Sequence, residues 1–219
     1  MRVLSVNRGR VTPIANAKAI GVTGIYKGPQ TGPVAVGALG LDGDAICDTE
    51  NHGGVDQAVY VYGEPDYRWW AAELGRELLP GTFGENLTLS DMESAAMAAG
   101  DRLLIGDLIL EITAPRIPCV TLARRMEDPA FLKRFRAAER PGVYCRVIRA
   151  GAVQAGDSVR YEPYPGERLG VIEQFRGFFE QRWDEATIRR HLAAPIAIRD
   201  RVEKEQQLAT LLAEADRQP

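Results

Sequence analysis

The sequence predicts a mainly β, α+β protein: a strand-rich domain over residues 1–163, then a small three-helix domain over residues 164–219. Short β-branched and aromatic runs, separated by glycine and proline turns, extend to about residue 162. Beyond Pro163–Gly166 the strand signals stop, and apolar residues recur at helical spacing. A length of 219 residues suits one large domain with an appendage, or two small ones.

The first strands are expected to be short. Residues 3–6 alternate between apolar and polar, and residues 19–26 and 34–41 are expected to be strands on either side of a glycine- and proline-rich loop at 27–33. The β-branched and aromatic run at 58–62 predicts a buried strand.

A helix is expected to begin at Pro65, where the missing N–H of proline costs nothing, and to end at Gly81. We expect the Trp69–Trp70 pair to pack at the core and its rim. The predicted apolar face consists of Tyr67, Trp70, Leu74 and Leu78.

The run at 103–112 predicts a hairpin, because a glycine opens a two-residue turn at its middle. Asp128 is a good cap for a helix over 131–139. Further strands are expected at 144–149 and 158–162.

The C-terminal segment predicts three helices, over 169–182, from Asp184 to about Pro195, and over 196–215. Helices this few cannot bury a core alone, so we expect them to pack on one another and on the strand domain or a partner chain. A homodimer contact is one interpretation of this segment. The apolar positions of the last helix are Ile198, Val202, Leu208 and Leu212.

Charge and composition exclude several classes of protein. Lys and Arg total 27 against 30 Asp and Glu, so a general nucleic-acid or polybasic membrane binder is not favoured. The basic residues between 124 and 140 are interpreted as a solvated helix face. No apolar run approaches the roughly 20 residues of a membrane span, and the first residues do not resemble a secretory signal.

The three cysteines, Cys47, Cys119 and Cys145, are scattered and form no CxxC pair. This spacing disfavours a zinc ribbon or a disulfide framework and indicates a reduced cytoplasmic protein with free thiols. We interpret Cys47 and Cys145 as packing residues.

Two stretches near the strands at 34–41 and 58–62 carry candidate site residues. Residues 40–44 and 51–58 combine glycines with His52 and Asp56, a pattern that lets a ligand approach the backbone or that simply forms a tight loop. Residues 82–88 place Glu85 and Asn86 side by side, either in a site or in a structural turn.

Two later stretches add a thiol and arginines. In residues 115–122, two prolines stiffen the chain around Cys119, and the cations of Arg116 and Arg124 favour its thiolate. Arg146 lies in a predicted strand, where it could bind a phosphate or remain solvated.

Together the motifs Gly-Leu-Asp-Gly-Asp, His-Gly-Gly-Val-Asp-Gln-Ala-Val, Phe-Gly-Glu-Asn-Leu and Arg-Ile-Pro-Cys resemble the MOSC domain family, the molybdenum-cofactor sulfurase C-terminal type domains. The closer resemblance is to stand-alone bacterial YiiM-like members, which carry a three-helix domain. It implies an irregular β-barrel that binds molybdopterin with molybdenum, and it implies no pyridoxal phosphate.

The resemblance implies that Cys119 is the thiolate ligand of the metal, a role that soft sulfur ligation makes chemically reasonable. It implies a cofactor pocket lined by further matching positions, with Lys27 and Arg146 as weaker candidates for the phosphate and pterin. Many relatives have lysine where this chain has Thr121, so Arg124 or Lys27 is expected to bind the cofactor tail instead. The remaining matching positions are His52, Asp56, Glu85, Asn86, Thr88 and Arg116.

The leading hypothesis is a molybdenum-dependent reductase of N-hydroxylated nucleobases, amidoximes or hydroxylamines, in which His52 or Asp56 passes protons. No Rossmann, flavin or iron–sulfur motif is present, so an external electron-donor reductase is expected as partner. One alternative is a sulfur carrier with a persulfide on Cys119. Another is a non-catalytic cofactor-binding or storage module.

Overall fold

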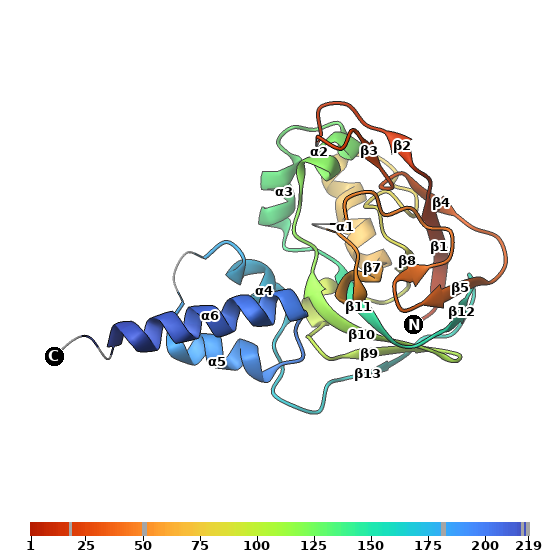
Figure 1. Ribbon diagram of the computed structural model, residues 1–219. Helices are drawn as coiled ribbons and strands as arrows, with labels where there is room; N and C mark the ends of the chain where they lie inside the picture. The colour runs from red at the N-terminus through yellow and green to blue at the C-terminus, as the bar shows by residue number, and fades with distance from the viewer. Residues whose placement is uncertain (18, 50–51, 181–182, 216, 218–219) are drawn as a thin grey trace.

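The computed structural model describes the whole chain except residues 18, 50–51, 181–182, 216 and 218–219. Its centre is an eight-stranded sheet in the order β13-β9-β10-β11-β7-β8-β1-β4, in which only the β7–β8 pair is parallel (Figure 1). Its strands are β1 (Val3–Gly9), β4 (Lys27–Pro29), β7 (Val59–Gly63), β8 (Leu87–Leu89), β9 (Arg102–Ile105), β10 (Leu108–Pro115), β11 (Val143–Arg149) and β13 (Arg160–Glu162).

Two smaller sheets accompany the large one. The three-stranded sheet has the order β12 (Gly151–Val153), β5 (Val34–Gly37), β6 (Gly40–Leu41), and β2 (Thr12–Pro13) pairs with β3 (Val22–Thr23). Val36 and Val153 of the three-stranded sheet belong to the same buried core as Val61 and Leu103 of the large sheet. The two sheets therefore enclose one hydrophobic interior.

A second, aromatic core lies under the helices α1 (Glu64–Leu74), α2 (Val120–Met126) and α3 (Phe131–Ala138). The ring centroids of the stacked Trp70 and Phe135 are 5.9 Å apart, and those of Phe83 and Phe131 are 6.5 Å apart.

Two short 3-10 turns, η1 (Val55–Gln57) and η2 (Ser94–Ala96), precede β7 and β9.

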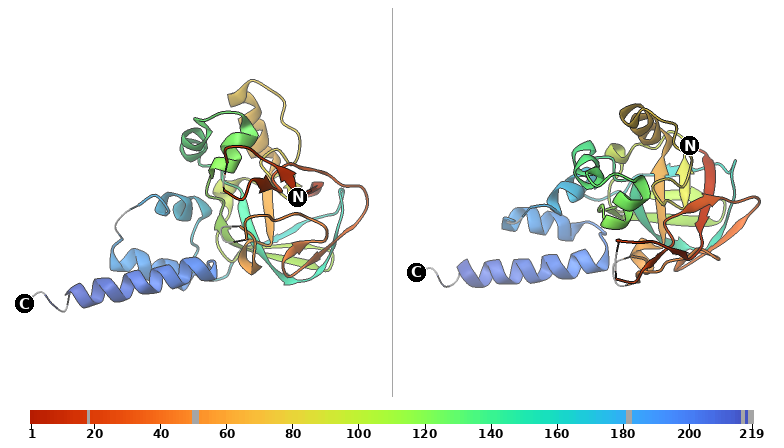
Figure 2. Two further views of the ribbon diagram at one scale, coloured as in Figure 1. Left: turned by 45° about the horizontal axis from the view of Figure 1, so that its top comes forward. Right: turned by 90° about the horizontal axis from the view of Figure 1, so that it is seen from above.

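The last three helices, α4 (Val171–Gly177), α5 (Glu185–Ala193) and α6 (Ile198–Ala215), lie to one side of the sheets, as both views in Figure 2 show. They are tied to the rest of the molecule through α4, because Val171 is buried in the main core and Phe175 in the aromatic core. Across the described residues, no helix has both the length and the apolar character needed to cross a membrane.

The expected fold class, mainly β with peripheral helices, is confirmed. The predicted hairpin at 103–112 forms from β9 and β10, and Asp184 caps α5 by accepting from the N–H of Thr187 at 2.7 Å. Trp70 is fully buried and Trp69 is partly exposed, as the sequence predicts for core and rim.

Three local expectations were wrong. The helix after Pro65 ends at Gly75 rather than Gly81, because Gly75 adopts a left-handed conformation (φ 63°) that closes the helix. Residues 34–41 form a hairpin of β5 and β6 rather than one strand, and of residues 19–26 only Val22 and Thr23 are in a strand.

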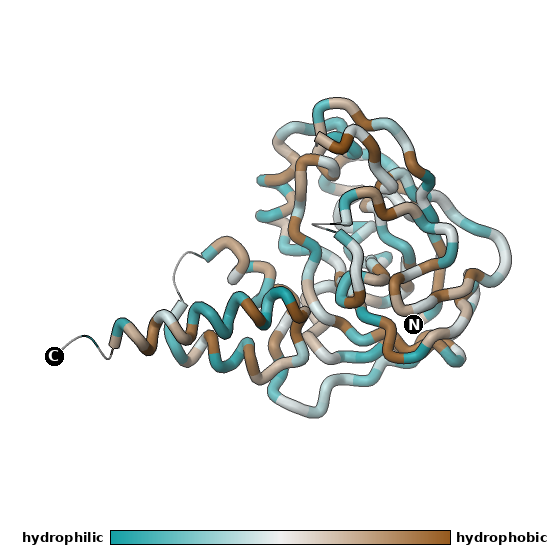
Figure 3. The backbone as a smooth tube through the Cα atoms, in the orientation of Figure 1, coloured by the Kyte–Doolittle hydropathy of each residue, from teal (hydrophilic) through white to brown (hydrophobic). Residues whose placement is uncertain are grey.

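The apolar positions of α6 do not form its buried face. Ile198 and Val202 are 56% and 45% exposed, whereas Lys204 is buried with its ammonium 3.7 Å from the centre of the Trp183 ring. The buried face of the helix thus places a lysine ammonium over an aromatic ring, a contact that the spacing of apolar residues does not predict. Figure 3 shows hydrophobic and hydrophilic residues mixed along this helix.

Candidate active-site cleft

One cleft gathers most of the chemically distinctive residues. It encloses about 760 Å³ of empty space, measured out to its open mouth, between the β3–β4 region, the loop before β7 and the segment that joins β10 to α2. Of the residues predicted from the sequence, the cleft is lined by Lys27, His52, Asn86, Arg116, Cys119 and Thr121.

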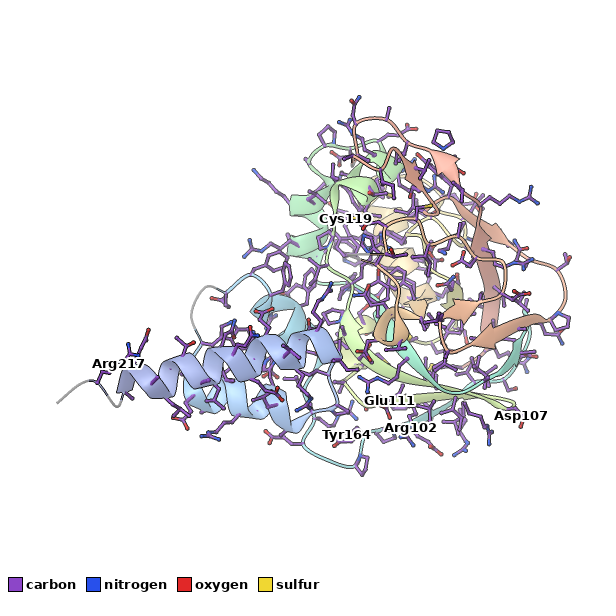
Figure 4. All side chains as sticks on the ribbon, viewed as in Figure 1. Arg102, Asp107, Glu111, Cys119, Tyr164 and Arg217 are labelled. Atoms are coloured by element: carbon purple, nitrogen blue, oxygen red, sulfur yellow. The ribbon has the colours of Figure 1, made fainter. Side chains whose placement is uncertain are left out.

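Cys119 is placed by the rigid segment between β10 and α2. Pro118 precedes it, and the Cys119 carbonyl accepts the N–H of Leu122 at 2.9 Å, so Cys119 caps α2. Its half-buried side chain lines the cleft. Figure 4 labels Cys119. Burial alone raises the pKa of the thiol, but a hydrogen bond with His52 and the charge of Arg116 outweigh it and lower the pKa to about 6. At neutral pH the side chain is therefore a thiolate.

Arg116 is a buried cation on the wall of the cleft. Its Nη1 donates to the carbonyl of Phe83, and its guanidinium lies 4.9 Å from the centre of the Tyr60 ring. Its Nε has no hydrogen-bond partner within the described part of the chain. The pKa of Arg116 is raised: burial works against the charge, but Tyr144, Tyr60 and Cys119 outweigh it, so the cation persists in the cleft.

Lys27 and Asn86 are joined by Asp44. The Asp44 carboxylate accepts from Asn86 Nδ2 at 2.8 Å and from the N–H of Gly9 at 2.7 Å, and it forms an ion pair with Lys27. Asn86 Oδ1 in turn accepts the N–H of Tyr60 at 3.1 Å. The pKa of Lys27 is lowered, because the effect of burial exceeds the opposing effect of the Asp44 charge. The ion pair lies on the cleft wall.

Glu85 and Thr88 lie behind the cleft wall rather than on it. Glu85 is fully buried, and one of its oxygens accepts from Tyr67 at 2.6 Å, from the N–H of Gly81 at 2.6 Å and from Thr88 at 2.8 Å. Burial raises the pKa of Glu85 against these hydrogen bonds. This cluster fixes the turn before Asn86.

Asp56 and Arg146 are brought together, but away from the cleft. Their side chains form an ion pair at 2.9 Å, Asp56 accepts the N–H of Ile198 at 2.6 Å, and Arg146 donates to the carbonyl of Ile196 at 2.8 Å. Both residues therefore fasten the start of α6 to the sheet. Arg146 of β11 reaches the Ile196 carbonyl because Ile196 lies in the connection between α5 and α6.

Arg124 also lies outside the cleft lining. Its Nε donates to the carbonyl of Asn16 at 2.9 Å on the exposed side of α2. The helix turns this side chain away from Cys119, because residues five apart on a helix do not share a face.

Sequence reasoning missed several residues on the cleft wall, above all Asp44, Tyr60, Tyr144 and Cys47. Asp44 stands in a motif that the sequence singled out, but nothing there marks it as the partner of Lys27. The tyrosines belong to β7 and β11, and only pairing of these strands brings their rings to 5.0 Å. Cys47 lines the cleft as well, and burial raises the pKa of its thiol.

The MOSC domain family model matches residues 48–160 of this chain, which include His52, Asn86, Arg116 and Cys119. The chain belongs to the MOSC family. YflK, described as an uncharacterized protein of Bacillus subtilis (strain 168), is 34% identical over 155 residues, which cover 70% of this chain and 70% of that protein.

Two further relatives and one solved structure extend the comparison. A protein named reductase from Gibberella moniliformis is 35% identical over 169 residues, 74% of this chain but only 30% of that protein. YiiM from Escherichia coli is 28% identical over 57% of both chains. The crystal structure of YiiM from Geobacillus stearothermophilus shares the fold, with a TM-score of 0.78 and 24% identity over 94% of this chain and 98% of that one.

The cleft residues fit the cofactor associated with MOSC domains. The unpartnered Nε of Arg116 is a donor for an anionic group, and the Lys27–Asp44 ion pair lies on the same cleft wall. Gly84 packs tightly against this wall, because a Cβ there would lie 2.8 Å from Ile25. Within the described part of the chain, no three His, Cys, Asp or Glu side chains form a metal site.

Proposed function

We propose that this MOSC protein uses a molybdenum cofactor to reduce N-hydroxylated compounds, such as N-hydroxylated nucleobases, amidoximes and hydroxylamines, with electrons from an external donor. The observation that carries the proposal is a half-buried thiol, Cys119, in one cleft with the buried cations Arg116 and Lys27. A relative named reductase, 35% identical over 74% of this chain, supports the reaction class.

In this proposal Cys119 ligates the metal, and Arg116 and Lys27 bind the anionic groups of the pterin. Asp44 holds Lys27 in place through their ion pair, and Asn86 in turn donates a hydrogen bond to Asp44. The cofactor, when bound, supplies a two-electron centre at which an N–O bond can be cleaved.

The reaction needs two protons and two electrons. The N–O bond of the hydroxylamino group breaks, the nitrogen leaves as the amine, and the oxygen leaves as water; the donor protein is oxidised by two electrons. In this proposal His52, which hydrogen-bonds Cys119, passes protons from solvent to the departing oxygen.

The first test is the molybdenum and pterin content of protein purified from cells that make the cofactor. Wild type is expected to carry both near stoichiometrically, and Cys119→Ala to have lost the metal. Cys47→Ala is the matched control, because this thiol lines the same cleft but has a raised pKa. The loaded protein is then expected to convert N-hydroxyadenine to adenine with a chemical reductant; no conversion would refute the reductase.

The lowered pKa of Cys119 also favours a second candidate, a sulfur carrier with a persulfide on this residue. It predicts one labile extra sulfur on Cys119 by intact mass analysis and no tightly bound pterin. Pterin fluorescence released by denaturation would rule it out in favour of the reductase.

A further inference from the structure

A second cavity lies between the sheet and the C-terminal helices, next to the Cys119 cleft. Its walls come from the end of β10, from α4, α5 and α6, and from Phe178, Glu180 and Trp183 between α4 and α5. It shares His52, Gln57 and Tyr144 with the first cleft, so the two spaces adjoin across these three side chains.

Three side chains that line this cavity carry a buried polar atom with no hydrogen-bond partner in the described part of the chain. Gln174 and His191 are 8% and 4% exposed, and neither Gln174 Nε2 nor His191 Nε2 has a hydrogen-bond partner within the described part of the chain. The same is true of Gln57 Oε1 on the shared wall. Buried polar groups in folded proteins are nearly always paired, so three such atoms around one cavity point to a ligand that pairs them.

These atoms define the chemistry of that ligand. The Gln174 amide nitrogen donates, the Gln57 oxygen accepts, and the ring nitrogen of a neutral histidine does either. His191 is neutral at physiological pH, because burial, with Lys204 and Arg190 nearby, lowers its pKa to about 4. A ligand with both a donor and an acceptor on one edge satisfies this set.

Three aromatic side chains form part of the remaining walls. Tyr144, Phe178 and Trp183 line the cavity, and Trp183 packs edge-on against His191 with ring centroids 4.6 Å apart. Aromatic walls suit a planar ring. A simple anion is a poorer fit, because the cations Arg199 and Lys204 share the cavity with the carboxylates of Asp200 and Glu203.

We propose that this cavity binds the heteroaromatic ring of the N-hydroxylated substrate, a purine or pyrimidine whose polar edge pairs with Gln174 and His191. The inference rests on the proposed reductase and makes the C-terminal helices the part of the chain that selects nucleobases over small hydroxylamines. The hydroxylamino group then projects across His52 and Tyr144 toward Cys119.

The test uses full-length protein and two readouts. Calorimetric titration with adenine, an unreactive planar ring with the same edge, measures binding without turnover. Steady-state assays measure the ratio of kcat/KM for N-hydroxyadenine to that for hydroxylamine, which has no ring. Gln174→Leu, nearly isosteric, is compared with Gln206→Leu, whose side chain is exposed on α6.

Gln174→Leu is expected to weaken adenine binding about tenfold and to lower the kcat/KM ratio about tenfold, because one donor to the ring edge is lost. Gln206→Leu is expected to match wild type in both. His191→Gln, which keeps a donor and an acceptor, is expected to retain more affinity than His191→Leu. Thermal melting of each variant checks that it is folded.

Equal adenine affinity in wild type and folded Gln174→Leu would overturn the assignment of the cavity. Adenine binding that depends on Gln174, with no reduction of either N-hydroxylated compound, would refute the reductase and leave the cavity as a heterocycle site. The two proposals therefore fail in different measurements.

Discussion

At the scale of single residues, the three cysteines differ because of their surroundings rather than their sequence neighbours. Cys145 is fully buried in β11, and Cys47 sits near Asp44; burial raises the pKa of both thiols. Cys119 alone among the three has a lowered pKa, because His52 and Arg116 lie beside it. The fold therefore favours the thiolate at one of the three free cysteines, Cys119.

We expect alkylation of cofactor-free protein by iodoacetamide at pH 7 to modify Cys119 first. The thiolate reacts, so the rate should rise about tenfold per pH unit below the pKa of about 6 and level off above it. His52→Ala should move this midpoint upward, because a hydrogen bond that favours the thiolate is lost. Peptide mass analysis over pH 4–9 measures this, and an unchanged midpoint in His52→Ala would contradict it.

Glu85 shows how a predicted site residue can serve the site without facing it. Glu85→Ala should lower the free energy of unfolding by about 2–4 kcal/mol, because it leaves the donors of Tyr67, Gly81 and Thr88 unpaired in the interior. Glu85→Gln keeps an acceptor oxygen and should cost less than half as much. Urea unfolding of the two variants compares them; equal losses would contradict this role.

At the scale of elements, the start of α6 is capped from far away in the sequence. Asp56, just before β7, accepts the N–H of Ile198 at 2.6 Å and also pairs with Arg146 on β11. A carboxylate at a helix start suits the positive end of the helix dipole. One side chain thus joins η1, β11 and α6.

Asp56→Ala should therefore destabilise the protein by about 1–2 kcal/mol and expose α6 to proteases. Asp56→Asn keeps a capping oxygen but loses the ion pair, so it should fall between wild type and Asp56→Ala. Thermal melting and limited trypsin digestion measure the two effects. If Asp56→Ala kept wild-type stability but lost reductase activity, the proton-transfer role expected from the sequence would be favoured instead.

At the scale of the whole molecule, the C-terminal helices are built into the strand-rich part of the chain. The fully buried Asp101 carboxylate accepts hydrogen bonds from Nη1 and Nη2 of Arg168, each at 2.9 Å, and from the N–H of Tyr164 at 2.8 Å. Val171 and Phe175 of α4 fill the two cores. The division into residues 1–163 and 164–219 stays a prediction, and truncation of the chain tests it.

A chain truncated after Pro163 should be markedly less stable than the full chain, because it loses the buried side chains of Val171 and Phe175. Each such loss leaves a cavity that costs about 2–5 kcal/mol. A chain that ends after Gly177 keeps α4 and should recover most of that stability. Differential scanning calorimetry compares the three chains; equal melting temperatures would show that residues 1–163 fold independently.

The sequence by itself determined the alternation of strands, the late switch to helices, and the stretches that meet at the cleft. These are local properties, since turn residues, periodicity and the prolines around Cys119 act within a few positions. The same local reading placed the end of the first helix at Gly81, because nothing in the apolar pattern shows that Gly75 adopts a left-handed conformation.

Only the tertiary structure decided which predicted residues face the cleft. Arg146 and Asp56 carry the right chemistry but are paired with each other beneath α6, whereas Asp44 and Tyr144 reach the cleft through strand pairing and loop packing. The cavity around Gln174 and His191 exists because helices and sheet, distant in sequence, pack together. A charge partner or a pocket wall depends on position in space, which no spacing along the chain specifies.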